Sequence, residues 1–171
     1  MRFSKLIFLL LVFLFLFCCT QAYDVREKVI FFQNKKASWI QDKKNLPQSD
    51  AEFYLDDPTP LFRKNFFLED IPLKATLHIT AAGYYRGSIN GFDLEKNILD
   101  PVWTDYSKRI YYSEYDITPK LIKGMNCFGV TLGNGFYNPL PLKMWGRINL
   151  RESLTVGKPR FIAKITVTHQ S

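Results

Sequence analysis

The 171-residue sequence lacks the short motifs that mark the commonest catalytic sites. It has no G-x-S-x-G, phosphate-binding glycine loop, Cys-x-x-Cys or H-E-x-x-H sequence, which removes the usual signatures of serine hydrolases, nucleotide-binding enzymes, dithiol redox proteins and zinc peptidases. The only histidines are His78 and His169, and His78 has no partner at metal-ligand spacing. We therefore assign no catalytic residue and no metal ligand from these motifs.

Cysteine is equally scarce: Cys18 and Cys19 lie near the amino terminus, and Cys127 lies far from both. If the first two are removed with a signal peptide, the thiol of Cys127 has no partner for an internal disulfide. The sequence around it, MNCFGV, is apolar and contains no histidine or lysine that would activate the thiol. This context predicts a small core residue.

Long hydrophobic runs are absent except at the amino terminus. Arg2 and Lys5 precede an apolar run of twelve residues, Leu6 to Phe17, and Thr20-Gln21-Ala22 follows it. This pattern predicts a signal peptide over residues 1–22, cleaved after Ala22, and export to the periplasm or the extracellular space. The run is too short for a membrane span, which needs about twenty residues, so we expect no transmembrane segment. Lipid anchoring through Cys18 or Cys19 is the alternative.

Acidic residues are outnumbered, and the formal net charge is +7. The basic residues are spread along the chain except for one cluster near the end, formed by Lys143, Arg147, Arg151, Lys158 and Arg160. Because an exported protein rarely meets nucleic acid, we predict no nucleic-acid partner. The cluster is interpreted as a solvated loop or as a face that docks another domain.

No long helical period occurs, and short alternating segments separated by turn residues predict an all-β, jelly-roll-like β-sandwich. Residues 23–60 form an N-terminal segment with short strands at VIFFQ and ASWI and an exposed loop. Residues 61–171 form the sandwich module, with a short helical piece after Pro119 and a long loop over 136–153. The expected strands are 61–68, 74–83, 84–89, 92–94, 109–118, 126–133 and 161–168. The last strand has nothing after it to complete its sheet, which suggests a module truncated at its C-terminal end.

The stretch GYYRGSINGFDL contains the clearest local signal. Asn90-Gly91 lies between two apolar-containing runs, and a type I′ turn needs positive φ at both central residues. The sequence therefore predicts a hairpin that pairs Tyr84–Ile89 with the run from Phe92 to Leu94.

Aromatic residues are abundant, especially over 84–115 and 136–145. Exposed aromatic rings on exported β-sandwiches suit the apolar face of a sugar, whereas alternating aromatics such as IYYSEY also suit ordinary strand packing. Carboxylate pairs could be assembled from Asp93, Asp100, Asp105, Glu114 and Asp116, but a glycosidase needs two carboxylates placed across a cleft. Nothing in the sequence indicates such a cleft.

Several separated motifs occur in a characteristic order: Gly83-Tyr84, Ile89-Asn90-Gly91, LDPVWTDY (99–106), KRIYYSEYDIT (108–118), Gly124 to Asn126, and LGNGFY (132–137). In this order they resemble the amino-terminal β-sandwich module of bacterial α-L-rhamnosidases. The resemblance covers roughly residues 61–169. It implies a glycoside hydrolase that releases terminal L-rhamnose, with its catalytic carboxylates in an (α/α)₆ barrel downstream of this module.

We therefore expect a non-catalytic accessory module of an exported α-L-rhamnosidase, with the missing catalytic domain of the parent chain as its partner. The alternative is a free-standing carbohydrate-binding module for rhamnose-containing glycans. A surface adhesion or protein-interaction domain also fits the fold.

Some modules of this kind are described as rhamnose-binding and calcium-assisted, so the resemblance points to Asn90, Trp103 and Asp105. A tryptophan suits sugar stacking, and Asn and Asp oxygens suit calcium. In the structural interpretation, which we favour, Asn90 makes the turn and Asp105 holds its loop. No cofactor is expected, with calcium as the alternative.

Overall fold

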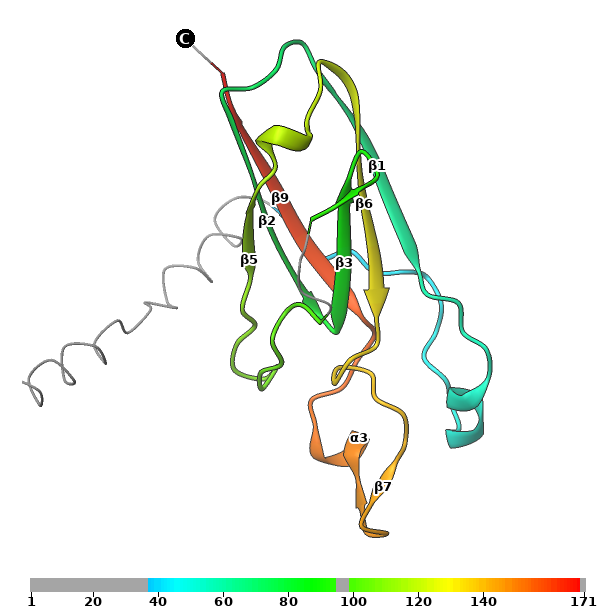
Figure 1. Ribbon diagram of the computed structural model, residues 1–171. Coiled ribbons are helices and arrows are strands. Elements are labelled where there is room, and N and C mark those ends of the chain that lie inside the picture. Colours follow the sequence, from blue (N-terminus) through cyan, green and yellow to red (C-terminus); the bar gives the residue numbers. More distant parts are fainter. Residues whose placement is uncertain (1–36, 95–98, 170–171) are drawn as a thin grey trace, which may run out of the picture.

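The computed structural model describes residues 37–94 and 99–169, and these residues form two antiparallel sheets packed face to face (Figure 1). The predicted signal peptide, residues 1–22, and the predicted strand at 29–33 lie outside the described residues. Within the described ranges, no helix is long and apolar enough to cross a membrane. The all-β sandwich predicted from the sequence is confirmed.

The larger sheet has four strands in the order β1-β6-β3-β4, and the smaller has three in the order β5-β2-β9. Their bounds are β1 Leu61–Leu68, β6 Gly124–Gly133, β3 Tyr84–Ile89, β4 Phe92–Asp93, β5 Ser113–Asp116, β2 Lys74–Ala82 and β9 Arg160–Thr168. Three short elements lie outside the sheets: the 3₁₀ helices η1 (Asp50–Tyr54) and η2 (Thr118–Lys120), and the helical turn α3 (Leu150–Ser153). A two-stranded hairpin of β7 (Lys143–Met144) and β8 (Ile148–Asn149) precedes α3.

The core lies between the sheets and follows the predicted alternation of β2. Ala75, Leu77, Ile79 and Ala81 are fully buried on one face of that strand. They belong to one apolar cluster with Tyr85 of β3 and with Val130 and Leu132 of β6, among others. Strand β9 also has the predicted inward face, since Phe161 joins this cluster and Ala163, Ile165 and Val167 pack against it.

Two glycine-dependent turns set the path of the chain. Only Gly83 separates β2 from β3, which lie in different sheets, and its φ is +107°. A Cβ atom at this position would lie 2.5 Å from the carbonyl oxygen of Gly133, so only glycine fits here. The predicted type I′ hairpin is confirmed, because Asn90 and Gly91 have φ of 52° and 83° and the strands on either side pair.

Three local predictions were wrong in extent. Only Ile40 of the predicted strand ASWI pairs, in a single bridge with Phe161. The strand predicted over 109–118 is limited to Ser113–Asp116. Just before it, the carbonyl of Tyr111 accepts a hydrogen bond from the Thr80 hydroxyl instead of joining a ladder. The predicted long loop over 136–153 contains β7, β8 and α3.

Candidate carbohydrate-binding site

Trp103 and Asp105 lie on the loop that leads into β5, and a compact turn holds this loop in shape. The carboxylate of Asp105 accepts hydrogen bonds from the backbone N–H and the hydroxyl of Ser107, at 3.0 and 2.6 Å. The carbonyl of Asp105 accepts from the N–H groups of Lys108 and Arg109, at 2.9 and 3.1 Å. An aspartate that closes its own turn in this way is a frequent loop device.

Trp103 is half-exposed at the edge of this loop. The residue is 44% exposed, and its ring centre lies 5.6 Å from that of Phe136 at an interplanar angle of 54°. Tyr106 holds the same loop to the sandwich, since its hydroxyl accepts a hydrogen bond from the N–H of Gly83 at 3.3 Å and its ring meets Tyr137 edge-on at 5.0 Å. One ring of the loop is therefore anchored while the other stays open to solvent.

A hollow of about 500 Å³ lies between this loop and the end of α3. It is lined by residues 103–107 on one side and 152–155 on the other. Its volume falls within the range of small-molecule sites, about 300 to 1,000 Å³. The lining offers two aromatic side chains, Trp103 and Tyr106, two carboxylates and several hydroxyls, a combination that can stack on a sugar ring and hydrogen-bond to its hydroxyl groups.

The carboxyl of Asp105 is held in its ionised form. The hydrogen bonds from Ser107 lower its pKa most, and Lys108, whose ammonium lies 3.3 Å from the second oxygen, lowers it further. A general acid for glycoside hydrolysis needs the opposite, a raised pKa. Asp105 is therefore suited to accept hydrogen bonds and unsuited to donate a proton.

Asn90, the third predicted site residue, is not part of this hollow. It lies past the other end of β3, where its side-chain oxygen accepts from the N–H of Cys127 at 2.8 Å. Its amide nitrogen donates to the carbonyl of Lys120 and to the side chain of Asn126, at 2.9 and 2.8 Å. The structure brings Trp103 and Asp105 together and gives Asn90 a role in the hairpin turn.

At both predicted calcium ligands, Asn90 and Asp105, a side-chain oxygen already accepts a hydrogen bond. A cation at Asn90 would have to displace the N–H of Cys127, and one at Asp105 would meet Ser107 donors and the ammonium of Lys108. Across residues 37–94 and 99–169, no group of three or more His, Cys, Asp or Glu side chains is placed to hold a metal ion. A calcium requirement stays a prediction from the resemblance.

The other four candidate carboxylates each have a structural partner. Asp93 pairs with Arg86 at 2.5 Å, and Glu114 lies 3.2 Å from His78. Asp116 accepts from the N–H and hydroxyl of Thr118 at the start of η2. Asp93 lies on β4 and Glu114 and Asp116 lie on β5, and each is engaged by a partner of its own.

Asp100, the fourth carboxylate, has hydrogen-bond partners in both sheets. One of its oxygens accepts hydrogen bonds from the hydroxyls of Tyr85, Ser113 and Tyr115, at 2.7, 2.7 and 2.6 Å. Burial raises the pKa of both tyrosines well above its usual range, and the hydrogen bonds to Asp100 raise it further. The cluster of Tyr85, Asp100, Ser113 and Tyr115, here called the Asp100 cluster, links β3 in one sheet to β5 in the other.

The basic cluster predicted near the end of the chain mainly holds the N-terminal segment. The guanidinium of Arg151 lies 4.1 Å from the centre of the Phe53 ring, and that of Arg160 lies 5.3 Å from the Trp39 ring. The ammonium of Lys158 lies 3.6 Å from the carboxylate of Asp42. Three of the five basic residues therefore bind residues 39–53 of the same chain.

Two further aromatics were missed as candidates by sequence reasoning. Phe136, which supports Trp103, is 42% exposed, and Trp145 is 81% exposed at the tip of the β7–β8 hairpin. The signal for Trp145 was present in MWGR, where a large ring precedes glycine in a polar stretch. An exposed tryptophan at a hairpin tip is a further surface for stacking.

Comparison with known proteins finds relatives among α-L-rhamnosidases. The family description "Alpha-L-rhamnosidase N-terminal domain" matches residues 71–171, more than half of the chain. An α-L-rhamnosidase of Alteromonas sp. (strain LOR) is 36% identical over 137 residues, which make up 78% of this chain and 14% of that protein. An α-L-rhamnosidase of Formosa agariphila is 41% identical over 76 residues, 44% of this chain and 8% of that protein.

Solved structures agree with these relatives. The α-L-rhamnosidase of Aspergillus terreus matches 77% of this chain with a TM-score of 0.63 and 26% identity, and the match covers 14% of that enzyme. The enzyme of Dictyoglumus thermophilum matches 81% of this chain with a TM-score of 0.60 and 32% identity, over 15% of its own length. The chain therefore spans only a small part of the proteins it resembles, and it belongs to the family of α-L-rhamnosidase N-terminal domains.

Proposed function

We propose that the chain is a non-catalytic accessory module of an exported α-L-rhamnosidase, a glycoside hydrolase that releases terminal L-rhamnose, and that it supports a catalytic domain elsewhere in the parent polypeptide. The observation that carries this proposal is the family match over residues 71–171, combined with the 14% of the Alteromonas relative that the chain spans. A module this small relative to its relatives leaves most of the parent enzyme outside it.

The contacts of the carboxylates support a non-catalytic role. A glycosidase needs an acid with a raised pKa and a second carboxylate on the opposite side of the scissile bond. Asp105 and Glu152 both line the hollow beside Trp103, but the pKa of Asp105 is lowered by Ser107 and Lys108. Asp105 therefore does not supply the acid that hydrolysis requires.

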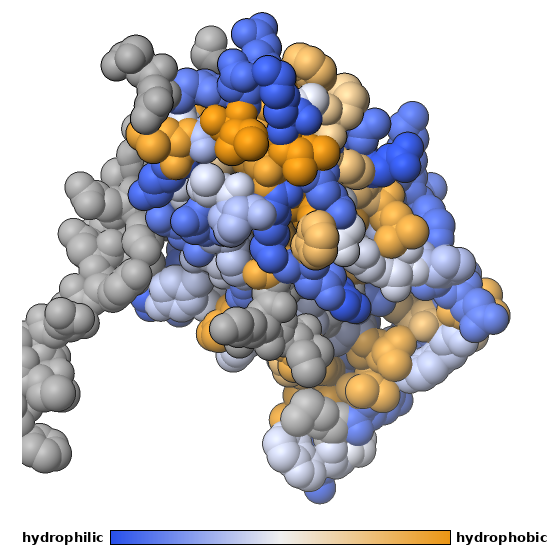
Figure 2. Space-filling view, turned by 45° about the horizontal axis from the view of Figure 1, so that its top comes forward, coloured by the Kyte–Doolittle hydropathy of each residue, from blue (hydrophilic) through white to orange (hydrophobic). Residues whose placement is uncertain are grey.

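One end of the sandwich exposes apolar side chains, which supports the proposal that the module packs against another domain. Figure 2, in which the top of the Figure 1 view is brought forward, shows apolar side chains gathered on that end, where the β1–β2 turn and the η2–β6 connection lie. Exposed residues in these two connections are Ile71 at 66%, Leu73 at 62% and Ile122 at 54%. Grouped exposed apolar side chains are typical of interaction surfaces.

The test of the accessory role is an activity assay on the purified 171-residue chain with an aryl α-L-rhamnoside. We expect no release of the aryl alcohol above the buffer rate. The matched variants are Asp105→Asn and Glu152→Gln, which remove the two carboxylates of the hollow. Turnover by the unchanged chain that either variant abolishes would contradict the proposal.

A second function, rhamnose binding, is favoured by the hollow itself. Trp103 presents a half-exposed ring beside an ionised acceptor, Asp105. The α-L-rhamnosidase of Streptomyces avermitilis was solved with L-rhamnose, and it matches 64% of this chain with a TM-score of 0.54 and 29% identity. In this proposal the indole covers the apolar face of the sugar while Asp105 accepts from its hydroxyl groups.

Calorimetric titration with L-rhamnose tests this second function. Trp103→Ala should remove binding, whereas Phe92→Ala, a matched loss of an aromatic ring that is 62% exposed on β4, should leave it unchanged. Equal affinity of the two variants would show that the hollow is not a rhamnose site.

Export is tested at the amino terminus. The predicted cleavage after Ala22 would leave Tyr23 as the first residue of the mature protein. Amino-terminal sequencing of protein expressed in a bacterium with a secretion system should therefore begin at Tyr23. A retained Met1 in the cytoplasmic fraction would contradict export.

A further inference from the structure

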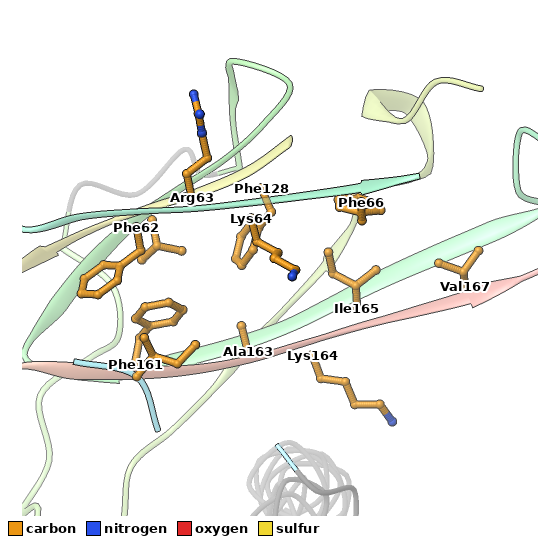
Figure 3. Close-up of a pocket in the computed structure, with 12 residues that line it drawn as sticks. Phe62, Arg63, Lys64, Phe66, Phe128, Phe161, Ala163, Lys164, Ile165 and Val167 are labelled. Carbon is orange, nitrogen blue, oxygen red and sulfur yellow. The ribbon is translucent and has the colours of Figure 1, made fainter. Parts of the chain in front are cut away.

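The two sheets part along one side of the sandwich and leave an apolar groove of about 650 Å³ between the strands β1 and β9. Figure 3 shows Phe62, Phe66 and Phe128 pointing from one sheet toward Ala163, Ile165 and Val167 of β9. All six side chains are only partly buried and pack against the core. The groove is therefore an opening into the hydrophobic interior along the length of β9.

The backbone of β9 faces this opening with hydrogen-bonding groups in place. Phe161 exchanges both of its backbone hydrogen bonds with Ile40, at 2.8 and 2.9 Å, on the side of β9 away from β2. Because backbone groups alternate in direction along a strand, the N–H and C=O groups of Ala163, Ile165 and Val167 point to the same side. Within residues 37–94 and 99–169, no backbone hydrogen bond reaches them.

The chain's own upstream segment fits this edge poorly. The pair between Ile40 and Phe161 sets an antiparallel register, and the described residues 37–39 do not continue the pairing. A continuation in that register would place Ser38 beside Ala163 and Lys36 beside Ile165. Polar side chains would then face an apolar groove, which costs free energy. Ile40 closes only the Phe161 end of the edge.

A second copy of the chain fits poorly for a different reason. Lys64 shares the inward face of β1 with Phe62 and Phe66, so its ammonium reaches the mouth of the groove (Figure 3). Two copies joined through this edge would bring their Lys64 side chains together, in a chain whose formal net charge is already +7. Like charges at an interface disfavour association.

We propose that this groove holds an extended segment that follows Ser171 in the longer parent polypeptide and runs back antiparallel to β9. This inference rests on the proposed function in one respect, that the chain is part of a longer enzyme. Strand β9 ends at Thr168, beside the Val167 end of the groove, so a short turn would return the chain along the open edge toward Ile40.

The groove also defines the chemistry of its occupant. The segment needs apolar side chains at alternate positions, which enter the space between Phe66, Phe128 and Ile165. It needs an acidic side chain near Lys64, because a charge at the mouth of an apolar groove is stabilised by an opposite charge. The available edge, from Ala163 to Val167, accommodates one short strand.

The experiment compares amide hydrogen exchange in two proteins, the 171-residue chain and the same chain extended by about twenty residues of its natural reading frame, enough for a turn and one strand. In the 171-residue chain, amide exchange along β9 should alternate between fast and slow. The amides of Ala163, Ile165 and Val167 should exchange fast, whereas those that face β2 should exchange slowly, namely Ile162, Lys164 and Thr166. In the extended chain, the first three amides should slow by about tenfold or more, with no change in the other three.

Two variants separate the groove from general apolar surface. Ile165→Glu places a charge in the groove and should abolish the added protection in the extended chain. Phe67→Glu, at an apolar side chain that is 64% exposed and does not line the groove, should leave the protection intact. If the 171-residue chain is insoluble, solubility replaces hydrogen exchange as the measurement. The extended chain should then be soluble, and Ile165→Glu should return it to the insoluble fraction.

Three results would overturn the inference. One is an extension that leaves Ala163, Ile165 and Val167 in fast exchange. Another is protection of these amides in the 171-residue chain that rises with protein concentration, because it would identify a second copy as the occupant. The third is a stop codon directly after Ser171. The first two results leave the proposed function intact, whereas a stop codon would also remove the parent polypeptide that the proposed function assumes. The exchange measurements therefore distinguish failure of this inference from failure of the proposed function.

Discussion

The two long sides of the sandwich are built differently. On one side, the Asp100 cluster joins β3 to β5 through three hydroxyl groups that converge on one carboxylate oxygen. On the other side, β1 and β9 meet mainly through the edge-to-face rings of Phe62 and Phe161, 5.2 Å apart, and the remaining space is the apolar groove. The first side is closed by directional bonds, whereas the second still exposes apolar surface.

The difference teaches that two edges of one sandwich can be closed by different kinds of interaction. Between the sheets, both sides share the same buried side chains of β2. At the Asp100 cluster the polar groups satisfy one another, so closure needs no further chain. At the groove the contacts between the two sheets are apolar, and closure needs further apolar side chains and a strand that pairs with the open backbone groups of β9.

The largest expected effect is on the closed side. Tyr85 is 2% exposed, so Tyr85→Ala would empty a buried aromatic site and remove one donor from Asp100. We expect a loss of about 3–5 kcal/mol in the free energy of unfolding. Urea denaturation followed by circular dichroism measures it, and a loss below about 1 kcal/mol would show that the cluster does not close the sandwich.

A smaller effect is expected from the charge of Asp100. Asp100→Asn keeps the shape of the side chain but replaces the carboxylate that accepts from Tyr85, Ser113 and Tyr115 with an amide. Because hydrogen bonds to a charged acceptor are stronger than neutral ones, we expect a loss of about 1–3 kcal/mol. The control is Asp93→Asn, whose partner Arg86 is exposed and whose change should have little effect on the denaturation midpoint.

The cluster also predicts a dependence on alkaline pH. The pKa of Tyr85 is raised in the folded state, so its contribution to stability is fully present below about pH 10, the pKa of an unfolded tyrosine, and is lost as the pH rises further. Thermal midpoints measured from pH 9 to 11 should therefore fall. The fall should be shallower in Tyr85→Phe, and identical slopes in the two proteins would contradict the assignment.

The smallest effect is expected in the groove. Ile165 is only partly buried where the groove is open, so Ile165→Ala in the 171-residue chain should cost less than about 1 kcal/mol. The same change at Ile79, which is fully buried on β2, should cost about 2–5 kcal/mol and serves as the control. Similar losses at the two positions would show that the groove side is as well packed as the core.

The predicted site residues Trp103, Asp105 and Asn90 show how much of the candidate site could be predicted from the sequence. The resemblance pointed to Trp103 and Asp105 in the loop LDPVWTDY, and their proximity follows from adjacency in the chain. The other wall of the hollow, residues 152–155, lies some fifty positions further along, and no local pattern connects it to Trp103. Asn90 was grouped with them by resemblance, yet it lies past the opposite end of β3.

The sequence by itself determined what depends on neighbouring residues. Alternation placed one face of β2 in the core, Asn90-Gly91 made a turn that needs two positive φ angles, and Pro119 lies in the first turn of a short helical piece. Only the tertiary structure decided which strands became edges and what met across the two sheets. Asp100 receives its hydroxyls from β3 and β5, and β9 is left open between Ala163 and Val167, because both outcomes depend on pairings between strands far apart in the chain.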